Sequence, residues 1–312
     1  MTDRVTLPRR PFGQTGIMVP PLCLGCAPLS SLPKAFNYEV PEERAFETIR
    51  AAFAGPMNYL DTSNSYGGGE SERRIGKVIR ELGGVPEGAI LQSKADRNAA
   101  NNDFSGPRMR RSIEESLERL GVERLEIAFL HDPEYGATFE ELTAPSGAVA
   151  TLQDLQREGI IGHLGVAGGP IDLMLRFLET GAFQAVLTHN RFTLLDQSAE
   201  PLLAYAAEHG IAALNAAPYG GGMLVKGPEA FPKYMYKDAS PELLARVKEI
   251  AALCDEYGIP LPAAALQFST RDPRIASTIV GLTRPERLTQ TIELYQHPIP
   301  DEFWARLNTS AS

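Results

Sequence analysis

The strongest constraint on the fold of this chain is a regular alternation of short apolar runs with longer amphipathic segments. Each run is apolar nearly throughout and too short for a typical helix, so it predicts a strand buried on both faces. Eight such runs occur, at residues 22–25, 59–61, 90–94, 127–131, 161–166, 185–188, 211–216 and 277–281. The segments between them carry apolar residues three and four positions apart, which predicts helices, among them 42–53, 108–120, 199–209 and 241–257.

Eight strand–helix units in a chain of 312 residues match the requirement of a (β/α)8 barrel. The sequence therefore predicts an α/β protein with the architecture of a TIM barrel. No long linker or Pro/Ser-rich stretch divides the chain, so we expect one domain over residues 1–312. The alternative is a doubly wound sheet, which needs a glycine-rich motif after an early strand, and residues 24–28 do not supply that motif.

The two ends of the chain carry patterns of their own. Residues 9–20 contain a glycine-bounded turn at 13–16 and predict an N-terminal β-hairpin before the first barrel strand. Phe303, Trp304 and Leu307 share one face at helical spacing, which predicts a C-terminal helix that docks on the barrel.

Composition and charge exclude several classes of protein. A net charge of −9 without any run of more than two basic residues argues against nucleic-acid binding. The apolar runs are too short to span a membrane, and residues 1–20 lack the apolar core of a signal peptide. Three cysteines cannot form a disulfide framework, which favours the cytoplasm. Cys23 and Cys26 have the spacing of zinc ligands, but no second pair follows, so we expect no metal.

Polar side chains end three consecutive runs of the predicted barrel. Asp61 ends the second run, Lys94 the third and His131 the fourth, while Tyr66 lies in the glycine-rich loop after the second. Because the active site of such a barrel forms at the carboxyl ends of its strands, we expect these four side chains to meet.

This set of groups has a definite chemistry. A tyrosine hydroxyl ordinarily has a pKa of about 10, and a neighbouring lysine ammonium favours the phenolate. A carboxylate paired with the lysine holds it in place, so the phenol becomes an acid and base of adjustable strength. A neutral histidine on the next strand can donate a hydrogen bond to the same substrate oxygen. The pattern predicts proton transfer to or from a carbonyl or alcohol oxygen while a hydride moves at carbon.

The residues that carry this chemistry resemble the aldo-keto reductase family. The motif Asp-Thr-Ser-x-x-Tyr-Gly-x-x-Glu-Ser-Glu-x-x-x-Gly at residues 61–76 is similar to the family signature, and Lys94 and His131 fall where the family places the rest of its catalytic tetrad. The resemblance covers nearly the whole chain, from Phe12 to Leu288. It implies a (β/α)8 barrel that binds NAD or NADP without a Rossmann fold, with the tyrosine as general acid and base.

The resemblance also implies where a dinucleotide binds. The segment after the eighth strand holds the adenine side in this family, and loops after the fifth and seventh strands lie near the nicotinamide and pyrophosphate. The cofactor contacts implied here are Ala167, Gly168, Tyr219, Gly220, Gly221, Gly281, Leu282, Thr283, Arg287 and Gln290. Members that prefer NADP commonly carry a lysine where this chain has Gly281. We therefore expect NAD to be favoured, with NADP as the alternative.

A few residues are similar to one branch of the family. Residues 215–218 after the seventh strand and 131–133 after the fourth resemble the branch of D-threo-aldose, L-fucose or L-galactose, and pyridoxal dehydrogenases. The resemblance implies a small-molecule substrate, a cyclic hemiacetal oxidised at its anomeric carbon to a lactone. Tyr66 would then be the base. The loops at 30–40 and 135–145 are the expected substrate walls, with contacts from Cys26, Phe36 and Tyr38.

Other functions remain open on the sequence alone. A pyridoxal 4-dehydrogenase-like enzyme or a general carbonyl reductase would use the same four residues. A Schiff-base aldolase could form an imine on Lys94 and would need neither Tyr66 nor an adenine-binding segment. A barrel that binds NAD(P) to sense redox state would show negligible turnover. The sequence leaves the oligomeric state open.

Overall fold

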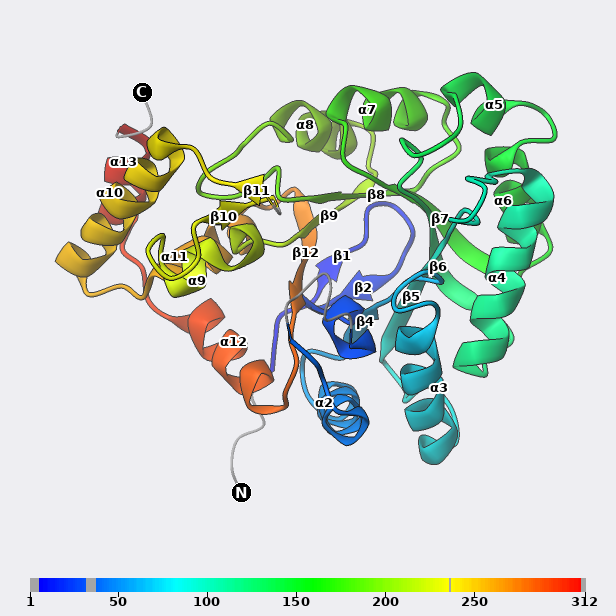
Figure 1. Cartoon of the computed structure of the whole chain (residues 1–312), viewed down its shortest axis with the longest axis horizontal. Coiled ribbons are helices and arrows are strands. Elements are labelled where there is room, and N and C mark those ends of the chain that lie inside the picture. Colours follow the sequence, from blue (N-terminus) through cyan, green and yellow to red (C-terminus); the bar gives the residue numbers. More distant parts are fainter. Residues whose placement is uncertain (1–5, 32–37, 236, 310–312) are drawn as a thin grey trace.

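Eight parallel strands close into a barrel in the computed structural model, which describes residues 6–31, 38–235 and 237–309 (Figure 1). The order around the barrel is β12–β3–β4–β5–β6–β7–β8–β9, so successive units are neighbours and the last strand pairs with the first. The strands are β3 (Leu22–Gly25), β4 (Tyr59–Asp61), β5 (Ile90–Ala95), β6 (Leu125–His131), β7 (Ile161–Ala167), β8 (Ala185–His189), β9 (Ala212–Ala216) and β12 (Ile275–Gly281). The predicted barrel and all eight of its strands are confirmed.

Helices surround the barrel and follow the predicted alternation. They are α2 (Glu42–Ala54), α3 (Glu70–Leu82), α4 (Gly106–Leu120), α5 (Phe139–Thr143), α6 (Ala148–Arg157), α7 (Ile171–Glu179), α8 (Glu200–Glu208), α9 (Met223–Lys226), α10 (Pro241–Tyr257), α11 (Leu261–Thr270), α12 (Glu286–Gln296) and α13 (Asp301–Thr309). Local signals set their ends. Ser105 caps α4 by accepting a hydrogen bond from the Arg108 N–H, and Gly121 ends the same helix in the left-handed conformation. In the described part of the chain, no helix is both long and apolar enough to cross a bilayer.

The N-terminal hairpin closes the amino end of the barrel. Strands β1 (Arg10–Pro11) and β2 (Met18–Val19) pair antiparallel, as the turn predicted. Phe12 is fully buried and packs with side chains from inside the barrel, such as Phe129. The Arg10 guanidinium donates to the backbone carbonyls of Thr270, Asp272 and Ile275 and so ties the hairpin to the start of β12. This end is therefore filled, which leaves the carboxyl ends of the strands for a site.

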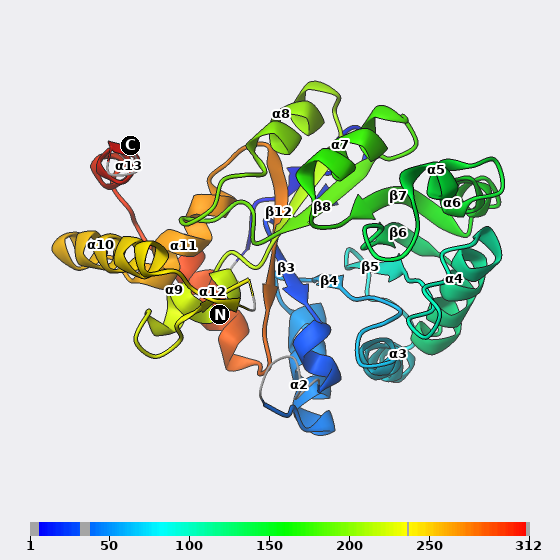
Figure 2. The same cartoon turned by 45° about the horizontal axis from the view of Figure 1, so that its top comes forward.

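A lobe stands beside the barrel between β9 and α11, and it confirms one prediction and corrects another. The helix predicted at 241–257 exists as α10, but its main contacts are with α11 and α13, and α11 packs on β12. Helix α13 was expected to dock on the barrel, yet it lies beside α10, away from the barrel strands (Figure 2). Its residues Phe303 and Trp304 pack in a hydrophobic cluster shared with α10 and α11. Apolar spacing predicted both helices correctly, but it does not say which neighbour buries the apolar face.

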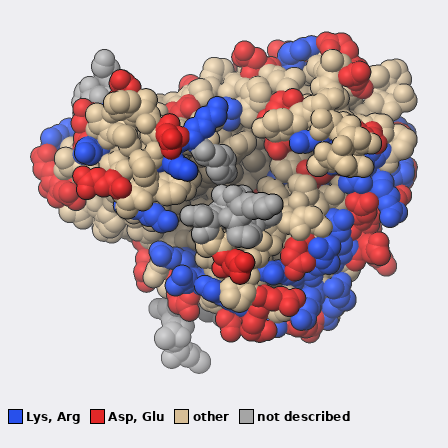
Figure 3. Space-filling view, in the orientation of Figure 1, with Lys and Arg blue, Asp and Glu red and all other residues tan. Residues whose placement is uncertain are grey.

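Helices α3 and α4 cross closely behind the strands that carry the predicted tetrad. A Cβ atom at Gly76 would overlap the carbonyl oxygen of Arg119, so only glycine allows this crossing. The cleft between the two helices is lined by six charged residues: Arg73, Arg80, Arg111, Glu115, Glu118 and Arg119. Figure 3 shows basic and acidic side chains mixed at the lower right of the molecule, the side on which α3 and α4 lie in Figure 1. The packing of α3 on α4 fixes the loop from β4 to α3, which contains Tyr66.

Candidate active site

The four residues of the predicted tetrad meet at the carboxyl ends of three neighbouring strands. Asp61 is the last residue of β4, Lys94 lies one residue before the end of β5, and His131 is the last residue of β6. Tyr66 reaches the same place from the loop between β4 and α3. Since β4, β5 and β6 are adjacent in the barrel, the structure brings together the residues that the sequence predicted.

Lys94 is buried at the centre of this group, with 1% of its surface exposed. Its ammonium lies 2.7 Å from Asp61 Oδ1, 2.7 Å from the carbonyl oxygen of Thr62 and 3.1 Å from the Tyr66 hydroxyl. Burial alone would lower the pKa of Lys94, but Asp61 and Tyr66 raise it above its ordinary value. The lysine therefore stays charged at neutral pH. A Schiff-base enzyme needs a neutral amine, so this geometry argues against the aldolase alternative.

Asp61 is held from its other side by a buried chain of hydrogen bonds. Gln92 Nε2 donates to Asp61 Oδ1 at 2.7 Å, and the Tyr59 hydroxyl donates to Gln92 inside the barrel. Both side chains that bind the Asp61 carboxylate, Lys94 and Gln92, come from β5. The pairing of β4 with β5 therefore fixes the orientation of Asp61. A residue held in this way can position Lys94 without taking part in proton transfer.

The pKa of the Tyr66 hydroxyl depends on burial as well as on Lys94. Lys94 does lower the pKa of the Tyr66 hydroxyl, but burial raises it more, and Asp61 adds to the increase, so the pKa lies above its ordinary value. Lys94 therefore favours the phenolate, as the sequence predicted, but it does not decide the net shift in the pKa of Tyr66. Desolvation of the charged form outweighs one nearby cation, and Tyr66 keeps its proton at neutral pH.

His131 has a partner that the sequence interpretation missed. Its Nδ1 lies 2.7 Å from Asp96 Oδ1, and its ring meets the Tyr66 ring edge to face with centroids 5.8 Å apart. Burial alone would lower the pKa of His131, but the carboxylates of Asp96 and Asp132 raise it above its ordinary value. The sequence predicted a neutral histidine, whereas this environment favours the imidazolium.

Two of the missed residues follow the same rule that identified the tetrad. Asp96 comes directly after β5, and His189 is the last residue of β8, so both are polar residues at strand ends. His189 was passed over because the strand was expected to end at Thr188. Burial lowers the pKa of His189, and Asp132, Arg191 and His131 act on it electrostatically. His189 is therefore a second imidazole that interacts electrostatically with residues of the site.

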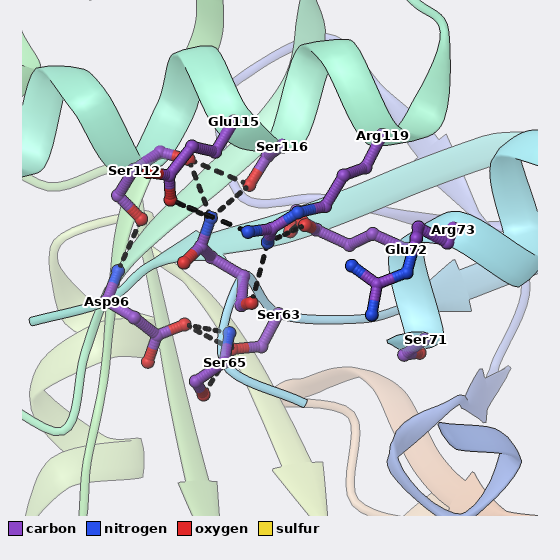
Figure 4. A network of polar contacts seen from close by, with 12 residues as sticks. Ser63, Ser65, Ser71, Glu72, Arg73, Asp96, Ser112, Glu115, Ser116 and Arg119 are labelled. Carbon is purple, nitrogen blue, oxygen red and sulfur yellow. Dashed lines mark hydrogen bonds and ion pairs between the residues drawn. The ribbon is translucent and has the colours of Figure 1, made fainter. Parts of the chain in front are cut away.

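A buried polar network supports the loop that carries Tyr66 (Figure 4). The Asn64 side chain donates to the carbonyl of Ser112 and to Glu115 on α4, at 3.0 and 3.2 Å. Glu72 on α3 is fully buried and accepts from Ser93 at 2.6 Å and from Arg119 at 3.1 Å. Burial raises the pKa of Glu72. The loop is thus held by α3, α4 and β5 together, which fixes the Tyr66 position.

The residues expected to hold the adenine side and pyrophosphate lie after β9 and β12, which are paired strands. Gly220 and Gly221 adopt φ values of 57° and 74° in a short 3-10 turn, so the backbone can approach a ligand there. Gly281, Arg287 and Gln290 are exposed, and Thr283 is partly exposed. Tyr219 is partly buried, and Arg287 acts on its hydroxyl electrostatically.

Leu282 is one of the expected cofactor contacts, and its side chain is buried. Its side chain is 7% exposed and packs in the core between strands and helices. An apolar side chain at this position fills the core, so only the Leu282 backbone is free to face a ligand.

The residues expected near the nicotinamide lie at the end of β7 and directly after it. Ala167 is buried at the end of β7, and its carbonyl accepts from the Asp132 N–H at 2.7 Å. The Gly169 N–H donates to Glu134 Oε1 at 2.9 Å, and a Cβ atom at Gly168 would lie 2.9 Å from Glu134 Oε2. Within the described residues, Glu134 Oε2 is buried without a hydrogen-bond partner.

These features fit a dinucleotide. Glycines with left-handed backbone at 220–222 give room for a pyrophosphate, and exposed guanidinium groups at Arg284 and Arg287 lie at the start of α12. The unpartnered acceptor oxygen of Glu134 suits a carboxamide, which offers N–H donors.

The expected substrate contacts are only partly placed. Cys26 is fully buried in the core, so its thiol offers no surface to a substrate, and the expectation that it borders the pocket is wrong. Burial also raises the pKa of its thiol. Tyr38 is 43% exposed. Phe36 lies outside the described residues.

Comparison with known proteins places this site in a family. The model of the aldo/keto reductase family matches residues 21–311. D-threo-aldose 1-dehydrogenase of a Pseudomonas species is 30% identical, with 94% of each chain covered. L-galactose dehydrogenase of Arabidopsis thaliana is 32% identical over 91% of this chain and 86% of its own length. Pyridoxal 4-dehydrogenase of Microbacterium luteolum is 28% identical, with 96% of each chain covered.

The fold agrees with solved structures. An aldo-keto reductase from Bacillus halodurans superimposes with a TM-score of 0.78 at 20% identity, over 97% of this chain and 96% of its own. That likeness concerns the barrel alone. The family model spans the tetrad, the supporting loop and the segment after β12 in one continuous match, and the chain therefore belongs to the aldo-keto reductases, a family of NAD(P)-dependent oxidoreductases.

Proposed function

We propose that this enzyme oxidises the cyclic hemiacetal of an aldose at C1 to the lactone, with NAD⁺ as the preferred cofactor. The observation that carries the proposal is the Tyr66 hydroxyl, 3.1 Å from an ammonium that is itself ion-paired with Asp61 and beside the His131 ring. The oxidation of aldoses is supported by the relatives, since two of them are named as dehydrogenases of sugars.

Each residue of the tetrad has a separate role in the reaction of the substrate hydroxyl. Tyr66 accepts the proton of the anomeric hydroxyl, Lys94 stabilises the phenolate that must form first, and Asp61 holds Lys94. His131 orients the same oxygen from the other side. A bound NAD⁺ would supply the acceptor for the hydride of C1. Because burial raises the pKa of Tyr66, we expect oxidation to become faster as the pH rises above neutrality.

The cofactor would be held by the glycine-rich turn after β9 and by the start of α12. Gly281 offers no cation for the 2′-phosphate of NADP, and Arg284 and Arg287 are exposed. Exposed ion pairs contribute only ~0–1 kcal/mol, so these arginines supply little preference for the phosphate. This reasoning supports NAD over NADP. Three free, buried cysteines support a reducing compartment, and we place the enzyme in the cytoplasm.

Pyridoxal is a second candidate substrate because one relative is a pyridoxal 4-dehydrogenase. Pyridoxal also forms a cyclic hemiacetal, so the same proton transfer by Tyr66 serves either molecule. The two candidates differ only in what the substrate walls accept.

A substrate panel with product analysis tests the proposal. The purified enzyme is given NAD⁺ or NADP⁺ with each of several aldoses and with pyridoxal, and the absorbance of reduced nicotinamide is followed while lactone is measured. The matched control for each sugar is its methyl glycoside, which lacks the anomeric hydroxyl. We expect lactone from at least one aldose, faster with NAD⁺, and none from the glycoside. Turnover of simple aldehydes with NADH, without oxidation of any hemiacetal, would contradict the proposal.

A further inference from the structure

Asp96 is a buried carboxylate that the tetrad does not account for. It follows β5, two residues after Lys94, and is 6% exposed. Oδ1 lies 2.7 Å from His131 Nδ1, while Oδ2 accepts the Ser65 N–H at 2.9 Å and the Ser63 hydroxyl (Figure 4). Burial alone would raise the pKa of Asp96, but His131 and these donors hold it below its ordinary value. Asp96 is therefore an anion beside the imidazole.

The second nitrogen of the ring also faces a carboxylate. His131 Nε2 lies 3.6 Å from Asp132 Oδ1. Asp132 adopts the left-handed conformation, with φ of 47°, and its N–H donates to the carbonyl of Ala167. A non-glycine residue is rarely found with such a backbone, so the chain holds this carboxylate in place against a local preference.

Two acceptors on opposite nitrogens limit the forms that the ring can take. An ionised carboxylate cannot donate, so Nδ1 must carry a hydrogen to bond with Asp96. In a neutral ring Nε2 would then hold a lone pair directed at Asp132. The imidazolium carries a hydrogen on both nitrogens, so it bonds with Asp96 through Nδ1 and places positive charge, not a lone pair, 3.6 Å from Asp132.

Other charged or titratable groups also face the ring. The ammonium of Lys94 opposes protonation of His131, and the Tyr66 hydroxyl is neutral. The groups that interact with His131 come from four parts of the barrel: Lys94 and Asp96 from β5 and its end, Tyr66 from the loop after β4, Asp132 and Glu134 from the segment after β6, and His189 from β8. The nearest of them, at 2.7 Å, is Asp96.

We propose that Asp96 is a positioning residue that keeps His131 protonated, so that its Nε2–H donates to the substrate oxygen during the reaction. The inference rests on the proposed function for its consequence. The hydroxyl has one hydrogen, which passes to Tyr66, and a lone pair of the same oxygen accepts the hydrogen bond from His131. A neutral ring bonded to Asp96 would compete with Tyr66 for that hydrogen. Asp96 thereby separates the roles of the two side chains.

The variant Asp96→Asn tests this role because the amide keeps the shape of the side chain and an acceptor for Nδ1 but removes the charge. Glu115→Gln is the matched control. Glu115 also anchors the loop, through Asn64 at 3.2 Å, and touches neither His131 nor Asp96. If Asp96 only supported the loop, the two variants would have the same effect on His131.

Nuclear magnetic resonance of ring ¹⁵N nuclei gives the first measurement. The chain has five histidines, and His131 is assigned by the signal missing from His131→Gln. We expect the His131 imidazolium to persist above the ordinary titration range in the unmodified enzyme. The titration midpoint should fall by about one pH unit in Asp96→Asn and stay unchanged in Glu115→Gln. An unshifted midpoint in Asp96→Asn overturns the proposal.

Kinetics of aldehyde reduction with NADH gives the second measurement. Reduction needs both Tyr66 and His131 protonated, so kcat/KM should fall as the pH rises through the titration of His131. Asp96→Asn should move this fall to lower pH by about the same unit, and Glu115→Gln should not move it. If Asp96→Asn does not fold, the unmodified enzyme decides: a neutral His131 at pH 7 with hydrogen on Nε2 overturns the proposal. Failure to oxidise any aldose would instead defeat the proposed function alone.

Discussion

The catalytic side of the barrel mouth and the cofactor side are built differently. Around β4 and β5, the buried polar groups are paired: Asp61 with Lys94 and Gln92, Asp96 with His131, and Glu72 with Ser93 and Arg119. The buried side-chain atoms without a partner among the described residues lie elsewhere, on Glu134, Thr188, Asn190, Asn215 and Ser277. Glu134 lies after β6 and Asn190 after β8, while Thr188, Asn215 and Ser277 lie in β8, β9 and β12.

The backbone shows the same difference. The loop that carries Tyr66 is bonded to α4 through Asn64, whereas the turn at 220–222 consists of glycines with positive φ. The comparison teaches that the acid–base apparatus is preorganised by the protein, which is where a fixed geometry contributes most to rate. We propose that the unpartnered polar groups and the glycine backbone of the cofactor side serve contacts with a dinucleotide.

Removing the Lys94 cation from the catalytic side should have the largest effect on stability. Lys94→Met leaves Asp61 buried without its partner, and breaking a buried ion pair in this way costs about 3–5 kcal/mol. Urea unfolding followed by circular dichroism measures the loss. Lys248→Met is the control, because Lys248 is 62% exposed and should change stability by less than about 0.5 kcal/mol. Equal effects of the two variants would remove the contrast between a buried and an exposed pair.

Overpacking the contact between α3 and α4 should have the next largest effect on stability. Gly76→Ala places a methyl group against the Arg119 carbonyl, and such overpacking costs about 1–3 kcal/mol. Thermal unfolding measures the cost. Gly181→Ala is the comparison, since a Cβ there would meet no atom within 4 Å, although its φ of 72° carries its own strain. A Gly76→Ala enzyme as stable as the parent would mean that α3 and α4 separate freely.

Adding a cation to the cofactor side should have a smaller effect. Gly281→Lys places an ammonium where NADP-preferring relatives carry one, and we expect NADP⁺ use to rise by up to tenfold, about 1.4 kcal/mol. A Cβ at this position would lie 3.0 Å from Pro28 Cγ, so the ring must shift slightly. The ratio of kcat/KM for the two cofactors is the measurement. A tenfold preference for NADP⁺ before the change would show that other residues hold the 2′-phosphate.

The smallest effect should come from the exposed arginines between α3 and α4. Arg111 is 62% exposed and bonded to Glu115 at 3.2 Å. Exposed helical pairs contribute about 0.3–0.5 kcal/mol, so Arg111→Ala should lower stability by no more than that and leave kcat unchanged. A clear loss of kcat in Arg111→Ala would mean that the charged cleft between α3 and α4 affects the position of the loop that carries Tyr66.

Strand ends explain how much of this site the sequence could predict. A buried strand followed by a polar residue identified Asp61, Lys94 and His131, since parallel strands bring their carboxyl ends together. The same rule applies to Asp96 and His189, which were missed because strand boundaries are uncertain by a residue or two.

Other features depend on packing that no local pattern encodes. The net rise in the pKa of Tyr66 follows from burial, which outweighs Lys94 only in the folded protein. Cys26 directly follows β3 and Leu282 directly follows β12, yet both side chains are buried in the core. The arginines at 73, 80, 111 and 119 are dispersed in the sequence and meet only where α3 crosses α4.

The central claim, that Tyr66 moves the proton, is tested most directly by replacing its hydroxyl alone. Tyr66→Phe keeps the ring against His131 and removes the group that Lys94 binds. Steady-state oxidation of the best aldose is compared in Tyr66→Phe and in Tyr205→Phe, a tyrosine on α8, with NAD⁺ binding measured by fluorescence. We predict a loss in kcat of at least ~10²-fold in Tyr66→Phe with cofactor binding retained, and none in Tyr205→Phe. Turnover near the parent value in a folded Tyr66→Phe enzyme would contradict the account.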